Sequence, residues 1–230
     1  LQALSKRPVP SVDVVYKELA ADRKAELQAT LDEGYTMKGS PIHPLRVLHE
    51  LKQVVTPETT LCLDVGSHYI WMNRYAAADH ARQVLVSNGQ QTLGVALPWA
   101  IASSLLNPQK PVISVSGDGG FLFTATELET AVRMGSRFVH LIWNSHSYNM
   151  VEFQEQAHYG RVSGIELGHY DVVKFAEAFG CRGYDVKSAD SLGDILRESL
   201  EQTVPVLINI PIDYTENIKL MKDIPQEFIH

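Results

Sequence analysis

The protein has 230 residues, of which 45% are hydrophobic and 20% are charged, and its formal net charge is −7. This length and composition suit one large domain, or one domain and a tail, and exclude a wholly disordered chain. The acidic balance argues against a nucleic-acid partner, whose binding surface would be basic. Two cysteines cannot build a disulfide framework or a cysteine-rich zinc site, so we expect a reducing, cytoplasmic setting. The longest uncharged run, residues 83–109, has too short an apolar part to cross a bilayer, so we expect no membrane partner.

The first 40 residues differ in character from the rest of the chain. Residues 12–31 predict a charged helix with few large apolar positions, and Pro and Gly residues flank it on both sides. We interpret residues 1–40 as a linker or docking helix and residues 41–230 as the folded domain. A plain solvated surface helix is the alternative interpretation of residues 12–31.

From residue 43 onward, short apolar segments alternate with helical ones. The predicted strands cover residues 60–65, 84–87, 111–116, 138–143, 184–187 and 206–210. The predicted helices cover residues 43–54, 92–106, 126–134, a segment from 148 onward, 171–179 and 191–202. Strands of consecutive apolar residues separated by helices predict an α/β fold, a doubly wound parallel sheet with helices on both faces.

Ligands of such sheets bind beyond the carboxyl ends of the strands, so the segments that follow strands are the candidate sites. One of them, Gly117-Asp118-Gly119-Gly120, combines glycines, whose amides a phosphate can approach closely, with one carboxylate. It matches neither G-x-G-x-x-G nor the P-loop pattern. The carboxylate indicates a diphosphate held through a divalent cation, because Mg²⁺ commonly bridges protein carboxylates and phosphate oxygens. An aspartate that merely stabilises a tight turn is the alternative.

A second polar loop begins at Asn144, after the 24 residues 120–143, and follows the next predicted strand. Loops that follow adjacent parallel strands lie side by side, so Asp118 and residues 144–147 can share one cation. The pattern is similar to the thiamine diphosphate motif, in which G-D-G is followed by Asn at a comparable interval. Over residues 40–215 the chain resembles the catabolic acetolactate synthases, the flavin-free relatives of acetohydroxyacid synthase. The resemblance depends on four segments in the same order: DVGSHYIWMNRY, SNGQQTLGVALPWAIA, SVSGDGGFLFTATELETAVR and NSHSYNMVEFQ.

The resemblance implies a thiamine diphosphate and Mg²⁺ site. It assigns the Mg²⁺ to Asp118, Ser145 and the main-chain carbonyl of Ser147. Ser145 departs from the family, which has Asn or Asp there; Asn144 or a bridging water could replace it. The resemblance also implies a cofactor-binding set and a substrate pocket: Gly117, Gly119, Gly120 and His68 at the diphosphate, Gln91 at the aminopyrimidine, Leu93 beneath the bent cofactor, and Met150, Val151 and Gln154 facing the reacting carbon.

The implied reaction decarboxylates pyruvate and joins the product to a second pyruvate, giving 2-acetolactate and CO₂. The glutamate that activates the cofactor in this family lies in a separate pyrimidine-binding domain of the other subunit. We therefore expect this chain to correspond to the last domain only, to contain no catalytic residue and to be inactive alone. The surface that faces the pyrimidine-binding domain should be apolar and uncovered around Leu93, Val95, Trp71 and Met150, and should favour a homodimer or higher oligomer.

Three alternatives stay open from the sequence. The first is another thiamine diphosphate-dependent decarboxylase or carboligase, which product analysis would distinguish. The second is a nucleotide-binding module without catalysis, which the missing glycine fingerprints disfavour. The third is a zinc hydrolase built from the 9 histidines, for which no H-x-x-x-H pair on a helix is present.

Overall fold

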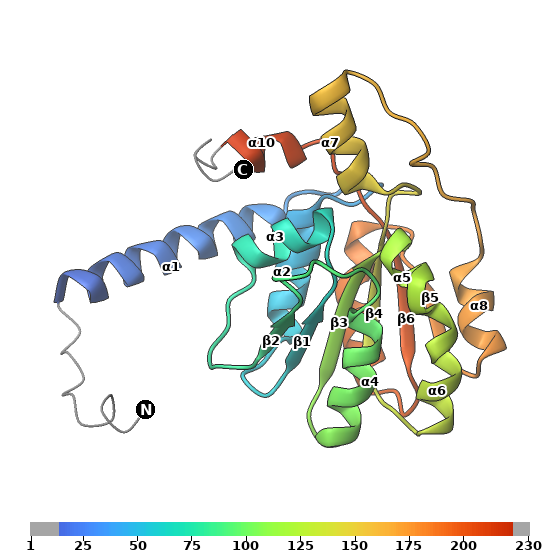
Figure 1. Ribbon diagram of the computed structural model, residues 1–230. Coiled ribbons are helices and arrows are strands. Elements are labelled where there is room, and N and C mark those ends of the chain that lie inside the picture. Colours follow the sequence, from blue (N-terminus) through green and yellow to red (C-terminus); the bar gives the residue numbers. More distant parts are fainter. Residues whose placement is uncertain (1–13, 223–230) are drawn as a thin grey trace, which may run out of the picture.

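The computed structural model describes residues 14–222 and contains one parallel six-stranded sheet. The strand order is β2-β1-β3-β4-β6-β5, and every adjacent pair is parallel (Figure 1). The strands are β1 (Thr60–Leu63), β2 (Val84–Val86), β3 (Val112–Gly117), β4 (Val139–Asn144), β5 (Arg182–Asp185) and β6 (Val206–Pro211). The predicted fold class is confirmed.

Helices cover both faces of the sheet (Figure 1). They are α1 (Val14–Gly34), α2 (Pro44–Val54), α3 (Ser67–Tyr75), α4 (Ala96–Leu106), α5 (Asp118–Thr124), α6 (Leu128–Arg133), α7 (Asn149–Tyr159), α8 (Val172–Ala178), α9 (Leu192–Leu200) and α10 (Asn217–Lys222), with short 3₁₀ turns at Ala125–Glu127 and Ala189–Ser191. The buried side chains form two clusters. One joins the sheet to α1, α2, α3 and α9, and the other joins it to α4, α5, α6 and α8.

Alternate residues of each central strand enter the two clusters. In β3, Ile113 and Val115 belong to the first cluster and Val112 to the second. In β4, Leu141 and Ile142 divide in the same way. Because successive side chains of a strand point to opposite faces, a sheet covered on both faces needs apolar residues at nearly every position. This explains why the strands appear in the sequence as unbroken apolar runs.

The structure corrects several predicted element boundaries. The predicted helix 92–106 starts only at Ala96, because the positive φ angles of Gln91 (51°) and Gly94 (82°) hold the preceding segment in a loop. The predicted helix 126–134 begins as a 3₁₀ turn before α6. Helices α3, α5 and α10 were not predicted. Strand β5 lies two residues earlier than predicted.

The N-terminal helix α1 extends away from the sheet (Figure 1). Its last turns pack on the domain through Leu27 and Leu31, whereas Tyr16 is 69% exposed. The predicted helix is therefore confirmed from residue 14 onward, and its residues 12 and 13 lie outside the described part. None of the helices within residues 14–222 combines the length and the apolarity needed to cross a membrane.

Candidate functional site

A cleft lies at the carboxyl edge of the sheet, where the segments after β1, β3 and β4 meet. Residues from the loop before α4 and from the start of α7 complete it. Ten of the predicted site residues line this cleft: His68, Leu93, Gly117, Asp118, Gly119, Gly120, Ser145, Ser147, Met150 and Val151. Gln91 and Gln154 do not line it; both are exposed. The chain thus brings together residues that are up to 83 positions apart, since 151 − 68 = 83.

The G-D-G segment connects β3 to α5 without a loop between them. Its position is fixed by β3, which is reinforced against β4 by a buried histidine. Both ring nitrogens of His140 face serine hydroxyls of β3, Nδ1 at 2.7 Å from Ser114 Oγ and Nε2 at 2.9 Å from Ser116 Oγ. Burial lowers the pKa of His140 to about 3, so the ring is neutral and can donate through one nitrogen and accept through the other.

Two glycines of the segment occupy positions where no side chain fits. A Cβ on Gly119 would lie 2.5 Å from the Tyr148 ring, and a Cβ on Gly120 would lie 2.5 Å from Asp64 Oδ2. Their amides stand in the first turn of α5, where N–H groups lack partners within a helix. The packing of Tyr148 and Asp64 therefore requires glycine at both positions, and amides in the first turn of a helix can bind an anionic group.

Asp118 is the acidic group of the cleft and is only 4% exposed. Its Oδ1 accepts a hydrogen bond from the Gly119 amide at 3.1 Å, and the amides of Ser145 and His146 also stabilise the carboxylate. Its Oδ2 is buried and has no partner within the described residues. Burial raises the pKa of Asp118 from 3.8 to about 6, and the amide hydrogen bonds oppose that rise. An ionised, desolvated carboxylate with a vacant acceptor fits a cation.

The loop after β4 brings neutral oxygen atoms to the same cleft. Ser145 Oγ lies 3.3 Å from both the hydroxyl and the carbonyl oxygen of Ser147. The Asn144 side chain already has hydrogen-bond partners within the protein. Its Oδ1 accepts a hydrogen bond from the His146 amide at 3.0 Å, and its Nδ2 donates one to Asn209 Oδ1 at 2.9 Å. His146 has a φ of 56°, a conformation that non-glycine residues seldom adopt outside constrained sites.

One carboxylate with hydroxyl and carbonyl oxygens is a hard donor set of the kind that Mg²⁺ accepts. In the described part of the chain, no group of three His, Cys, Asp or Glu side chains could hold a metal ion. The predicted residues therefore fit an ion that retains water and phosphate oxygens among its ligands, and the zinc alternative finds no support there.

His68 contributes a further unpartnered atom of the cleft. It is 1% exposed, and its Nε2 lies 3.0 Å from the main-chain oxygen of Asp64, which can only accept. Nε2 therefore carries a hydrogen, and Nδ1 is buried without a partner among residues 14–222. Burial lowers the pKa of His68 to about 4, so the ring is neutral near pH 7. To donate a hydrogen bond to a phosphate oxygen, Nδ1 must first take up a proton.

Asp64, which was not among the predicted site residues, positions the loop that carries Leu93. Its two carboxylate oxygens accept hydrogen bonds from the Gly94 amide at 3.0 and 2.8 Å. A Cβ on Gly94 would lie 2.8 Å from Phe123 Cβ, so only glycine allows this approach. The pKa of Asp64 is raised by burial to about 6. The one available signal was an aspartate within the apolar strand predicted over residues 60–65.

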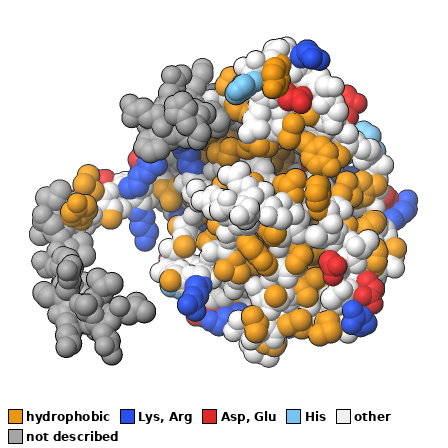
Figure 2. All heavy atoms as spheres, viewed as in Figure 1, with side chains coloured by type: hydrophobic (Ala, Val, Ile, Leu, Met, Phe, Trp, Pro, Cys, Tyr) orange, Lys and Arg blue, Asp and Glu red, His pale blue; other side chains and the backbone are white. Residues whose placement is uncertain are grey.

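The predicted uncovered apolar surface is wrong in one of its four members. Trp71 is 2% exposed and donates through Nε1 to Asn217 Oδ1 at 2.7 Å, because α10 covers it. Leu93, Val95 and Met150 are partly buried. Nearby, the exposed hydrophobic residues are instead Leu122 and Phe123 on α5 and Val151 on α7. Hydrophobic side chains also gather on the face of the molecule that Figure 2 shows.

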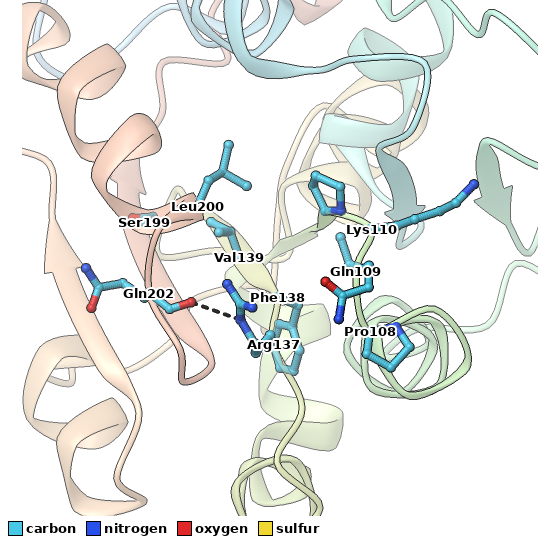
Figure 3. A pocket seen from close by; sticks show the side chains of 11 residues that line it. Pro108, Gln109, Lys110, Arg137, Phe138, Val139, Ser199, Leu200 and Gln202 are labelled. Atoms are coloured by element: carbon cyan, nitrogen blue, oxygen red, sulfur yellow. Dashed lines mark hydrogen bonds between the residues drawn. The ribbon is translucent and has the colours of Figure 1, made fainter.

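A second cavity lies at the opposite, amino-terminal edge of the sheet (Figure 3). The starts of β3 and β4 and the end of α9 surround it. Arg137 Nε donates there to the main-chain oxygen of Gln202 at 3.2 Å. None of the predicted site residues lines it, and the glycine amides and Asp118 lie at the other end of the strands, so the predicted site coincides with the carboxyl-edge cleft.

The fold and the cleft define an α/β domain whose glycine amides and buried carboxylate would suit a diphosphate group and a cation. Comparison with known families makes this specific: residues 64–210 match the thiamine pyrophosphate enzyme, C-terminal TPP binding domain, and the chain belongs to this family. This membership decides between thiamine diphosphate and a nucleotide in favour of thiamine diphosphate.

The chain is similar to several proteins named as acetolactate synthases. It is 45% identical over 223 residues to "Acetolactate synthase" of Bacillus subtilis (strain 168), and the matched region covers 95% of this chain and 39% of that protein. It is 46% identical over 204 residues to "Acetolactate synthase, catabolic" of Raoultella terrigena, covering 89% of this chain and 36% of that protein. The chain therefore spans about two fifths of the length of these relatives.

Proposed function

We propose that this chain is the cofactor-binding domain of an acetolactate synthase, which releases CO₂ from one pyruvate and joins the remaining two carbons to a second pyruvate. The product is 2-acetolactate. The observation that carries the proposal is Asp118, a buried carboxylate with one vacant oxygen in a cleft of glycine amides. The sequence identity of 45–46% to proteins named as acetolactate synthases supports the choice of reaction.

The proposed cofactor site uses the two halves of the cleft differently. Asp118, Ser145 and the Ser147 carbonyl would hold Mg²⁺, and the Gly119 and Gly120 amides would hold the diphosphate. Bound thiamine diphosphate supplies the electron sink that decarboxylation needs. The protein groups bind and orient it, and the desolvated cleft strengthens each charge interaction.

His68 and Gln91 would contact the polar parts of the cofactor, with a proton held at His68 Nδ1 when a phosphate oxygen lies against it. Leu93 would support the cofactor from below, and the loop that carries it is fixed by Asp64. On α7, Met150, Val151 and Gln154 would face the substrate.

The proposal includes a protein partner. Residues 1–40 would act as a linker, residues 41–230 as the diphosphate-binding domain, and a pyrimidine-binding domain from another subunit would supply the activating glutamate. The exposed Phe123 and Val151 suit such an apolar contact. We further propose a homodimer or higher oligomer in the cytoplasm, and an isolated chain that is inactive. The pathway role would be acetoin and butanediol synthesis or branched-chain amino acid synthesis.

The test uses the full-length protein that contains this domain, incubated with pyruvate, thiamine diphosphate and Mg²⁺. The proposal predicts 2-acetolactate as the main product, and its loss when either cofactor is omitted. Acetaldehyde as the main product would instead identify a decarboxylase. Full turnover by the 230-residue chain alone would contradict the need for a partner domain.

A further inference from the structure

Helix α7 forms part of the cleft wall although none of its residues is buried. Met150 and Val151 in its first turn line the cleft. In Figure 1, α7 stands above the carboxyl edge of the sheet, beside α10. A helix without a buried apolar face gains little hydrophobic stabilisation from the domain. Its position must therefore depend on polar contacts at its first turn.

Those contacts form a chain of hydrogen bonds that connects three helices. Trp71 Nε1 on α3 donates to Asn217 Oδ1 on α10 at 2.7 Å. Asn217 Nδ2 donates in turn to Asn149 Oδ1 on α7 at 2.9 Å. The same Asn149 oxygen accepts from Ser67 Oγ at 2.6 Å. Finally, Asn149 Nδ2 donates to Glu152 Oε2 at 3.3 Å.

The direction of every bond in this chain follows from its first member. The Trp71 indole can only donate, so Asn217 must turn its oxygen toward Trp71 and its NH₂ group toward α7. Asn149 must then present its oxygen to Asn217 and its NH₂ group to Glu152. Trp71 and Asn217 are 2% and 8% exposed. Reversing either amide would leave buried donors or acceptors unpaired, which is costly.

The far end of the chain reaches the loop expected to hold the metal. Glu152 Oε2 also accepts from Ser147 Oγ at 2.8 Å. The carboxylate of Glu152 therefore joins two donors, one from Asn149 and one from Ser147. The start of α7 and the loop after β4 are in this way held in one arrangement.

We propose that Asn149 and Asn217 are positioning residues: the directed hydrogen-bond chain from Trp71 to Glu152 fixes the start of α7 and thereby sets Met150 and Val151 in the cleft. The effect on α7 stands independently of the reaction. Its consequence for the cofactor rests on the proposed function.

The first test is Asn149→Asp in the 230-residue chain. The new carboxylate keeps the shape and still accepts from Ser67 and Asn217, but it faces the Glu152 carboxylate with no hydrogen to donate. We expect hydrogen exchange of the α7 amides to accelerate by roughly ten- to hundredfold, with a smaller change in β3 and β4. Because this measurement needs no cofactor, it reports on α7 even if the proposed function is wrong.

The decisive control restores the lost donor from the other side. In the double variant Asn149→Asp, Glu152→Gln, residues 149 and 152 are again one carboxylate and one amide. The side-chain amide at position 152 now donates the hydrogen bond, and the carboxylate at position 149 accepts it. We expect α7 protection, and the affinity for thiamine diphosphate with Mg²⁺, to return to within about threefold of the wild type. Glu152→Gln alone should have a small effect, since the Ser147 hydroxyl can still donate to the amide oxygen.

Three results would count against the proposal. If Asn149→Asp leaves α7 exchange unchanged, or if the double variant is no better protected than Asn149→Asp, the directed chain does not hold the helix. If protection is lost and regained while cofactor affinity stays constant, the role in the cleft is wrong. Should Asn149→Asp fail to fold, Asn217→Ala interrupts the same chain from α10 and must give the same selective loss of α7 protection.

Discussion

The floor and the α7 wall of the cleft are held in place by different forces. The floor, with Asp118 and His68, is buried between tightly packed strands and helices, and neither Asp118 Oδ2 nor His68 Nδ1 has a partner within the described residues. The wall buries no side chain and is fixed by side-chain hydrogen bonds. Packing makes the floor rigid but leaves its charge poorly solvated, whereas the wall can be altered without disturbing the core. We infer that the floor serves the diphosphate and the wall serves substrate choice.

The largest effect should come from removing the floor carboxylate. Asp118→Ala takes away the only charged oxygen assigned to the cation, so Mg²⁺-dependent binding of thiamine diphosphate should weaken by about a hundredfold or more. Calorimetric titration of the 230-residue chain measures this. Asp194→Asn, which changes an exposed carboxylate that does not line the cleft, is the control and should bind normally. Unchanged affinity in Asp118→Ala would refute the role of the floor.

A large effect on folding should follow from Gly120→Ala. The new methyl group would lie 2.5 Å from Asp64 Oδ2, which is held by the Gly94 amide and cannot easily move. We expect the free energy of unfolding to fall by about 2–4 kcal/mol, measured by denaturant titration. Gly168→Ala is the matched control, because a Cβ there meets no atom within 4 Å. Equal stability of the two variants would show that the floor tolerates expansion.

Asp118→Asn in the cofactor-free chain should raise the free energy of unfolding, whereas Gly120→Ala should lower it, and the change should be smaller. Since burial raises the pKa of Asp118 to about 6, the folded chain keeps a proton that the unfolded chain has lost between about pH 4 and pH 6. Wild-type stability therefore falls as the pH rises through that window. The variant, which does not titrate there, should be more stable by about 1–3 kcal/mol above pH 6 and equal near pH 4. Thermal unfolding at both pH values measures the difference, and a variant that is less stable at pH 7 would contradict it.

The smallest effect should be that of Gln154→Ala on the wall. Gln154 is exposed and makes no contact with the core, so the free energy of unfolding should change by less than about 0.5 kcal/mol. In the full-length protein the same variant should change the KM for pyruvate while cofactor affinity is kept, because the proposed role of Gln154 is to face the substrate. A stability loss like that of Gly120→Ala would show that the wall is packed as tightly as the floor.

The sheet and the meeting of its loops could be predicted because they follow from local sequence. Apolar runs separated by helices predict parallel strands, and adjacent β3 and β4 must carry their following loops to one edge. Asp118 and Ser145 therefore lie at one cleft, as expected.

What the sequence did not reveal depends on contacts between distant segments. In the sequence Asp64 looks like one more residue of the strand predicted over 60–65, and its role comes from Gly94, 30 residues away. Trp71 looks like an exposed apolar residue, and it is α10 that covers it through Asn217. In the sequence Gly183 resembles a strand break, yet it lies within β5. Glycine is needed there because α8 packs so closely that a Cβ would be 2.7 Å from Val173 Cα.

The most direct test of the account is a crystal structure of the chain with thiamine diphosphate and Mn²⁺, whose anomalous scattering locates the ion. The account predicts one anomalous peak about 2.0–2.3 Å from Asp118 Oδ2, with oxygens of the loop after β4 and of the diphosphate around it. A bound cofactor with no metal at Asp118, or with the peak at another group, would contradict it.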